Sequence, residues 1–509
     1  MPIRVRRFAP CLALALALSV VVGAQPSPSP ARAELQLELA DLLFGDQRYR
    51  EASLAYARAK EGARPEQLKR ASSGMLRSLM YIADFASTYQ EVLYLQSLGL
   101  DEDEADLRTL AGDGLWAYGM FEEAETIYQD VLATSPSNAR ARHGLARSLA
   151  ARSQYDRALL EIQAARATDS QDPLLHHMEG VILRGMHRFD EAAEAFDRYV
   201  GVFQDIRDTD QSRWARSEAD FLRAWEGRLP LEITGEDAVY TVPFAIVNDK
   251  IVVRARINGS EPIEVVVDTG AEQMVLSQET AEAVGVRPLS QTLSAGVGEV
   301  GLRGLESGRV DSVQIGSFEV RNVPAVIKNP PLGLEGMPSR RVPDGISPLA
   351  LGLSTKIDYR LRRLILAKEL PDEPADVELP MRMHRLAVVR GVVNGNPKSF
   401  VVDTGGEVIS ISLGTAATLT TRPPRHIPLR VFGTSGWDRE AYLLPGVNLS
   451  FSGIDYDNFS VVVLNLRRPS ALLGFQIGGI VGHDFLSNYR VTIDLKRSVL
   501  RLSRYEREI

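Results

Sequence analysis

The chain has 509 residues, of which 45% are apolar, and carries a formal net charge of −8. This length allows several hydrophobic cores, and the acidic balance, with no dense basic tract, argues against nucleic acid as a partner. The only cysteine, Cys11, lies in an N-terminal apolar segment. The remainder of the chain therefore forms neither disulfides nor a thiolate site.

The N-terminus has the pattern of a secretory signal. Arg4, Arg6 and Arg7 precede an apolar run over residues 11–22, which is too short to span a bilayer in a mature protein. We expect a signal peptide at 1–24, with cleavage as late as residue 33, and a Pro/Ser spacer at 25–33. Left uncleaved, the segment would be a membrane anchor. Export without disulfides is typical of a bacterial periplasm.

Residues 34–203 have a helical pattern with an internal repeat. Phe121, Tyr155 and Phe189 each open a similar four-residue motif, and they are 34 residues apart. Small residues recur ahead of each motif, at Gly112, Ala146 and Gly180. This period resembles the tetratricopeptide repeat, which implies four or five repeats in a solenoid whose concave face is a candidate site for a peptide or protein partner. Residues 204–238 are expected to form a helical linker.

The Asp-Thr-Gly triplet occurs twice, at Asp268-Thr269-Gly270 and Asp403-Thr404-Gly405, each time directly after an apolar run. Two carboxylates held close together cannot both ionise, so they share a proton and can act as acid and base on one water molecule. One triplet alone is a common strand-to-turn signal. Two triplets in matching surroundings predict a two-carboxylate site.

The flanks of the two triplets match over about 120 residues. The matching features are an Asn-Gly turn, a serine suited to cap a helix, and a late Ile-Asp pair. They fall at Asn258 and Asn394, Ser277 and Ser412, and Asp358 and Asp494. The spacing predicts two duplicated all-β units.

With these motifs, residues from about 240 to 507 resemble two retropepsin-type aspartyl protease domains in tandem. The resemblance implies that Asp268 and Asp403 form the catalytic dyad and that Thr269 and Thr404 brace the two loops, while Gly270 and Gly405 permit the tight turns. It also implies glycine-bearing flaps over the site. The candidates are the hairpins that contain Gly298 and Trp437, although ordinary solvent-facing loops would have the same composition.

Two positions depart from the family pattern. The stretch Gly479–Gly482 matches the apolar-apolar-Gly element of the family, but in the first half Pro348 replaces the small glycine unless Gly352 supplies it. Gly406 stands where the family has Ala or Ser, and its freedom could loosen the loop that carries Asp403.

The sequence thus predicts a multidomain chain, with an all-α tetratricopeptide-repeat solenoid followed by an all-β, retropepsin-like (acid protease) double domain. Lobe 1 is expected at 239–370, a linker at 371–382 and lobe 2 at 383–507. The expected function is a secreted aspartic endopeptidase that needs neither a cofactor nor a metal. The alternative is a non-catalytic adaptor with a degenerate protease fold. Pairing of the lobes within one chain or between two chains is left open.

Overall fold

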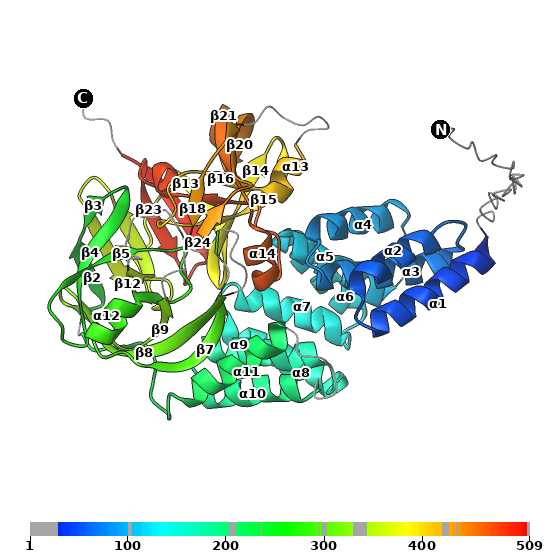
Figure 1. The fold of residues 1–509 in the computed structure, drawn as a ribbon, viewed down its shortest axis with the longest axis horizontal. Coiled ribbons are helices and arrows are strands. Elements are labelled where there is room, and N and C mark those ends of the chain that lie inside the picture. Colours follow the sequence, from blue (N-terminus) through cyan, green and yellow to red (C-terminus); the bar gives the residue numbers. More distant parts are fainter. Residues whose placement is uncertain are drawn as a thin grey trace, which may run out of the picture.

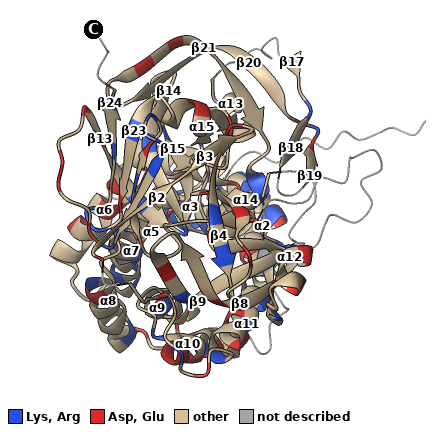
Figure 2. Ribbon diagram, turned by 90° about the vertical axis from the view of Figure 1, so that its left-hand side faces the viewer, with Lys and Arg blue, Asp and Glu red and all other residues tan. Residues whose placement is uncertain are grey.

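The fold is that of a computed structural model, which describes residues 29–99, 104–202, 210–235, 237–294, 296–297, 303–328, 344–419, 427–433 and 436–505. A helical region runs from the N-terminal side and meets two β lobes (Figure 1). Basic and acidic residues are interspersed over the ribbon (Figure 2).

The helical region is a right-to-left stack of paired helices in Figure 1. Within the described residues, ten helices form five consecutive pairs: α1 (Pro30–Gly45), α2 (Tyr49–Ala59), α3 (Pro65–Tyr81), α4 (Phe85–Ser97), α5 (Ala105–Tyr118), α6 (Phe121–Thr134), α7 (Ala139–Ala150), α8 (Tyr155–Thr168), α9 (Pro173–Gly185) and α10 (Phe189–Val202). An eleventh helix, α11 (Asp210–Arg223), follows them.

Small residues allow the paired helices to cross closely, as the repeat predicts. A Cβ on Gly112 would lie 2.9 Å from the Tyr128 ring, and one on Gly180 would lie 2.7 Å from the Phe196 ring. Both rings are fully buried. Because glycine has no side chain, the aromatic ring of the paired helix packs directly against the backbone at these positions.

Lobe 1 contains a sheet that curls on itself, because β8 pairs with both β4 and β9. Its strands in the described part of the chain are β1 (Glu232–Ile233), β3 (Ala245–Val247), β4 (Lys250–Ile257), β5 (Ile263–Val267), β6 (Met274–Ser277), β7 (Pro288–Ser294), β8 (Arg303–Ile315), β9 (Phe318–Lys328) and β10 (Gly345–Ile346). One short helix, α12 (Gln278–Ala283), is capped by Ser277, as expected.

Lobe 2 repeats this plan, and its sheet also curls because β20 pairs with β14. Its described strands are β14 (Leu386–Val393), β15 (Asn396–Val402), β16 (Ser410–Ser412), β17 (Ile427–Pro428), β18 (Val431–Gly433), β19 (Gly436–Asp438), β20 (Tyr442–Phe451), β21 (Ile454–Leu464) and β22 (Gly479–Val481). Its helices are α13 (Leu413–Ala417), capped by Ser412, α14 (Arg467–Leu473) and α15 (His483–Leu486).

A shared sheet joins the lobes within one chain. Its strands are β2 (Val239–Pro243), β12 (Arg363–Ala367), β11 (Ser354–Asp358), β23 (Tyr489–Asp494), β24 (Val499–Arg504) and β13 (Val377–His384), in that order. The lobes meet where Lys356 of β11 stands opposite Thr492 of β23. The sequence left open whether the lobes pair within one chain or between two, and in this structure they pair within one.

The solenoid and lobe 2 share a hydrophobic core. Trp116 and Phe121 of the solenoid are buried in one cluster with Val401, Phe475 and Ile477 of lobe 2. The Gln476 N–H donates to the Ala117 carbonyl across this interface, at 2.8 Å. The helices and the β lobes therefore form one packed body rather than two units joined by a tether.

Three expected boundaries differ from the structure. Helix α1 begins at Pro30 with Ser29 as its cap, inside the expected spacer, because Pro suits the first turn of a helix. Strand β13 occupies the second half of the expected 371–382 linker, where prolines and charges mask the strand pattern. Strand β1 pairs with β9 and so places the end of the 204–238 linker in lobe 1.

Candidate active site

Each triplet aspartate lies where a central strand ends beside a short parallel neighbour. The Asp268 N–H donates to the Ile346 carbonyl of β10, and the Asp403 N–H donates to the Val481 carbonyl of β22, both at 3.0 Å. Ile346 and Val481 are the last residues of these neighbouring strands and pair with Val267 and Val402, so the strand pairing also holds the backbone of the aspartates themselves. Both aspartates are half-buried, which leaves the pair open to a substrate.

The two threonines tie the loops together. The Thr269 N–H donates to the Thr404 hydroxyl at 3.1 Å, and the Thr404 N–H donates to the Thr269 hydroxyl at 3.0 Å. Each hydroxyl in turn donates across the lobes, from Thr269 to the Val402 carbonyl and from Thr404 to the Val267 carbonyl, both at 2.8 Å. All these groups are buried, so the pairing of the lobes is fixed at the site itself.

The glycines of the triplets let each aspartate approach the opposite loop. A Cβ on Gly270 would lie 2.4 Å from Cγ of Asp403, and a Cβ on Gly405 would lie 2.5 Å from Cγ of Asp268. No side chain fits at either position. The Gly270 and Gly405 N–H groups also donate to the aspartate of their own loop, at 2.9 and 2.8 Å.

The two carboxyl groups interact directly. Lost hydration, the negative charge of Asp403 and a hydrogen bond from one carboxyl group to the other raise the pKa of Asp268 to about 7. Lys328 and the Gly270 N–H oppose this shift. A proton shared by the pair is therefore retained close to neutral pH, because ionising both groups would place two negative charges side by side.

The expectation that Pro348 occupies the position of Gly482 in lobe 2 is wrong by one residue. Strand register makes Ile346 the counterpart of Val481, so Ser347 stands at the position of Gly482 and Pro348 at that of His483. The replacement of His483 by proline in lobe 1 changes a backbone hydrogen bond. The His483 N–H donates to the Gly406 carbonyl at 2.8 Å, whereas proline has no N–H to donate to the lobe 1 loop.

Gly406 does not loosen its loop. Its N–H donates to the Asp403 carboxylate at 2.9 Å, and its carbonyl accepts the His483 bond. A Cβ at this position would lie 3.1 Å from the same carboxylate, which is tight but not a clash. The Asp403 loop is thus held on both sides of Gly406.

Two ion pairs between the lobes stand at equivalent positions of the two halves of the site. No local sequence pattern predicts them. Arg385 contacts Glu272 through Nε and Nη2, at 2.7 and 2.6 Å. Lys250 lies 3.9 Å from Glu407 and donates to the Gly405 carbonyl. Arg385 lies 135 residues after Lys250, and Glu407 lies 135 residues after Glu272. The same spacing separates Asp268 from Asp403. Superposing the two halves of the sequence would have revealed them.

The two candidate flaps are hairpins that meet. Strands β7 and β8 pair antiparallel on the lobe 1 side, and β18 and β19 pair on the lobe 2 side. A Cβ on Gly433 would lie 2.3 Å from the Val297 carbonyl, so the hairpins are in contact. Trp437 is half-buried in β19. Gly298 lies outside the described residues.

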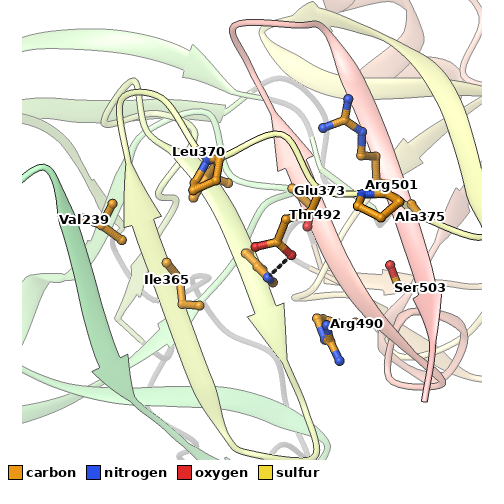
Figure 3. A pocket seen from close by; sticks show the side chains of 12 residues that line it. Val239, Ile365, Leu370, Glu373, Ala375, Arg490, Thr492, Arg501 and Ser503 are labelled. Carbon is orange, nitrogen blue, oxygen red and sulfur yellow. Dashed lines mark hydrogen bonds and ion pairs between the residues drawn. The ribbon is translucent and has the colours of Figure 1, made fainter. Parts of the chain in front are cut away.

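A separate pocket of about 170 Å³ lies over the shared sheet (Figure 3). Val239, Ile365 and Ser503 line it, and the Lys356–Glu373 ion pair, at 2.5 Å, crosses it. None of its lining residues belongs to the aspartate loops. Across the part of the chain that the structure describes, no cluster of His, Cys, Asp or Glu suits a metal ion, and no helix is long and apolar enough to cross a membrane.

Comparisons with family models agree with this fold. Family models match residues 253–337 (gag-polyprotein aspartyl protease), 389–485 (aspartyl protease) and 115–182 (tetratricopeptide repeat). An aspartic proteinase from Irpex lacteus aligns with 53% of this chain and 98% of its own, at 14% identity and a TM-score of 0.32.

A tetratricopeptide-repeat protein of Thermus thermophilus aligns with 37% of this chain and 98% of its own, at 17% identity and a TM-score of 0.31. No curated protein matches the chain. The family matches confirm the expected fold class, an all-α repeat solenoid followed by an all-β protease double domain.

Proposed function

We propose that this chain, which carries two aspartyl protease domains behind a tetratricopeptide-repeat region, is an aspartic endopeptidase with Asp268 and Asp403 as its dyad. The observation that carries the proposal is the close approach of each aspartate to the opposite loop, where a Cβ on Gly270 would lie 2.4 Å from Cγ of Asp403 and one on Gly405 would lie 2.5 Å from Cγ of Asp268. Burial and the neighbouring charge of Asp403 accordingly raise the pKa of Asp268. Burying two acids together costs stability unless they share a proton. Such a pair is a ready source of both an acid and a base.

In the proposed reaction, the ionised carboxylate removes a proton from a water molecule between the aspartates. The water oxygen then forms a bond to the peptide carbonyl carbon, while the protonated carboxyl group gives its proton to the carbonyl oxygen. The aspartate that took the water proton then gives it to the amide nitrogen, and the other aspartate takes a proton from a hydroxyl of the tetrahedral intermediate. The C–N bond breaks as the C=O bond re-forms, and the pair again holds a single proton. Thr269 and Thr404 hold the two loops at the separation that this exchange requires.

Peptide cleavage by the wild type, Asp268→Asn and Asp403→Asn tests the proposal. A diverse peptide library at about pH 4 to 7 covers the range in which a one-proton dyad acts. Cleavage by the wild type and its loss in both variants are expected. Folded wild type that cleaves nothing would favour the adaptor function instead.

We also propose that the enzyme is exported and that its repeats bind a protein or peptide, including a substrate segment outside the cleft. Arg4, Arg6 and Arg7 before the apolar run support export. Cleavage after Ala24 would leave Ser29 and Pro30 to begin α1, whereas cleavage after residue 33 would remove them. Sequencing the N-terminus of the protein secreted from a bacterial host would distinguish these sites.

A further inference from the structure

The two aspartate loops are not supported equally. In lobe 2, the His483 and Asp484 N–H groups donate to the Gly406 and Glu407 carbonyls, at 2.8 and 2.9 Å. In lobe 1, Pro348 stands in the place of His483 and has no N–H to donate. The loop that carries Asp268 therefore needs another support.

Arg385 supplies a contact to this loop through Glu272, which lies four residues after Asp268. Its Nε and Nη2 both lie within 2.7 Å of the same carboxylate oxygen. The pseudo-symmetric Lys250 is 3.9 Å from Glu407, whose side chain is 68% exposed, against 30% for Glu272. A short, shielded guanidinium–carboxylate pair is the stronger of the two.

The solenoid fixes the turn that carries Arg385 through three consecutive residues. The Met383 N–H donates to the Ala151 carbonyl at 2.6 Å. The His384 ring packs edge-on against Trp116, with 5.8 Å between centroids. The Arg385 guanidinium lies over the Trp214 ring of α11, 5.7 Å from its centroid. The equivalent residues of lobe 1 are 248–250, of which Asn248 and Asp249 are exposed.

Trp214 is itself held by the solenoid. Its ring packs edge-on against Phe196, with 5.4 Å between centroids, and at a tilt against His177, with 5.8 Å between centroids. Burial, with the nearby charges of Arg385 and Arg184, lowers the pKa of His177 to about 4, so this ring is neutral beside Trp214 at higher pH. Helix α11 also packs against β7, the strand that leads to the lobe 1 flap (Figure 1).

We propose that the solenoid is part of the active site's support, with Trp214 as a positioning residue that holds Arg385 and, through Glu272, the loop that carries Asp268. For its kinetic consequence the proposal rests on the proposed peptidase function. The structural consequence, a fixed lobe 1 loop, is independent of catalysis. Trp214 touches neither aspartate, so its effect is transmitted by the Arg385 side chain.

Two readouts on the full-length protein test this proposal. Hydrogen exchange of peptides that cover residues 266–273 reports the loop directly. Steady-state kinetics report kcat and KM separately. Trp214→Ala should speed exchange of this loop and lower kcat, each by about tenfold, with KM little changed. Trp214→Phe keeps an aromatic face and should restore most of both.

The matched control is Arg390→Ala. Arg390 forms another ion pair between lobe 2 and the solenoid, with Glu123 at 2.6 Å, but its partner is not on an aspartate loop. In Arg390→Ala, the hydrogen exchange of the 266–273 loop and the kcat should equal those of the wild type. Arg385→Gln should reproduce the faster loop exchange and lower kcat of Trp214→Ala. The double variant should show no larger change than either single variant, because both substitutions break the same connection from Trp214 to the loop.

Unchanged exchange of the 266–273 loop in Trp214→Ala would overturn the proposal. Equal loss of kcat in Trp214→Ala and Arg390→Ala would overturn it as well, because it would indicate general loosening of the interface. If the wild type cleaves no peptide, the proposed function fails, and loop exchange alone then decides whether Trp214 positions the loop.

Discussion

The Thr269 hydroxyl accepts the N–H of Thr404, and the Thr404 hydroxyl accepts the N–H of Thr269. The two halves of the chain are thus joined at their active loops by reciprocal bonds between residues of the same type. Each hydroxyl also donates to a carbonyl of the opposite lobe. The connection cannot be removed from one lobe without affecting the other.

Thr404→Ala should therefore lower both stability and activity. It leaves the buried Thr269 N–H and Val267 carbonyl without their partners, at a cost of about 3 kcal/mol in the free energy of unfolding. Urea denaturation measures this loss. Thr404→Ser retains the hydroxyl and is the control. Equal stability of the two variants would contradict a role for the hydroxyl.

Stability should depend on the ionisation of Asp268. Its pKa rises from the usual 3.8 to about 7 in the folded protein, so the folded state binds the proton more tightly than the unfolded state. The resulting stabilisation is complete below about pH 4 and is lost as the pH rises through about 7. Asp268→Asn should abolish this dependence in urea titrations at pH 4 to 8. The same slope in wild type and variant would show that other groups cause it.

The activity should have a basic limit set by the same proton. Because the proposed reaction needs one proton on the dyad, kcat/KM should fall above about pH 7, by about tenfold per pH unit. A peptide substrate without ionisable side chains isolates the enzyme's own titration. A profile that stays level from pH 6 to 9 would be incompatible with this dyad.

Gly405→Ala should inactivate the enzyme with little change in overall fold. The new Cβ would lie 2.5 Å from Cγ of Asp268, so one loop must move. Peptide cleavage should fall at least about a hundredfold, since a displacement of about 1 Å has that effect. Gly201→Ala is the control, because a Cβ there meets nothing within 4 Å. Wild-type rates in Gly405→Ala would mean that the aspartates do not work in the geometry described.

The sequence predicted features that repeat or follow local rules. The Asn258 and Asn394 turns have left-handed φ angles of 51° and 47°, and Ser277 and Ser412 cap helices as expected. These signals are local, since a turn or a cap depends on a few neighbouring residues. The repeated Asp-Thr-Gly triplet also predicted one long-range relationship, the pairing of Asp268 with Asp403.

The remaining features depend on packing between distant segments. The Arg385–Glu272 contact joins residues 113 apart and then reaches α11, and no local pattern reports it. Strand β13 lies partly in the predicted linker because Pro380 and its charges mask the alternation, although its pairing with β24 satisfies the backbone. Residue type alone places Pro348 at the position of Gly482, whereas the strand register places it at that of His483. In each case tertiary pairing overrides local composition.

The most direct test of the account compares peptide cleavage by the wild type, Asp268→Asn, Asp403→Asn and an equimolar mixture of the two variants. One site built from both halves of a single chain predicts cleavage by the wild type alone, with no recovery in the mixture, because the lobes pair through β11 and β23 of the same chain. Wild-type cleavage by either variant, or recovered cleavage in the mixture, would contradict it.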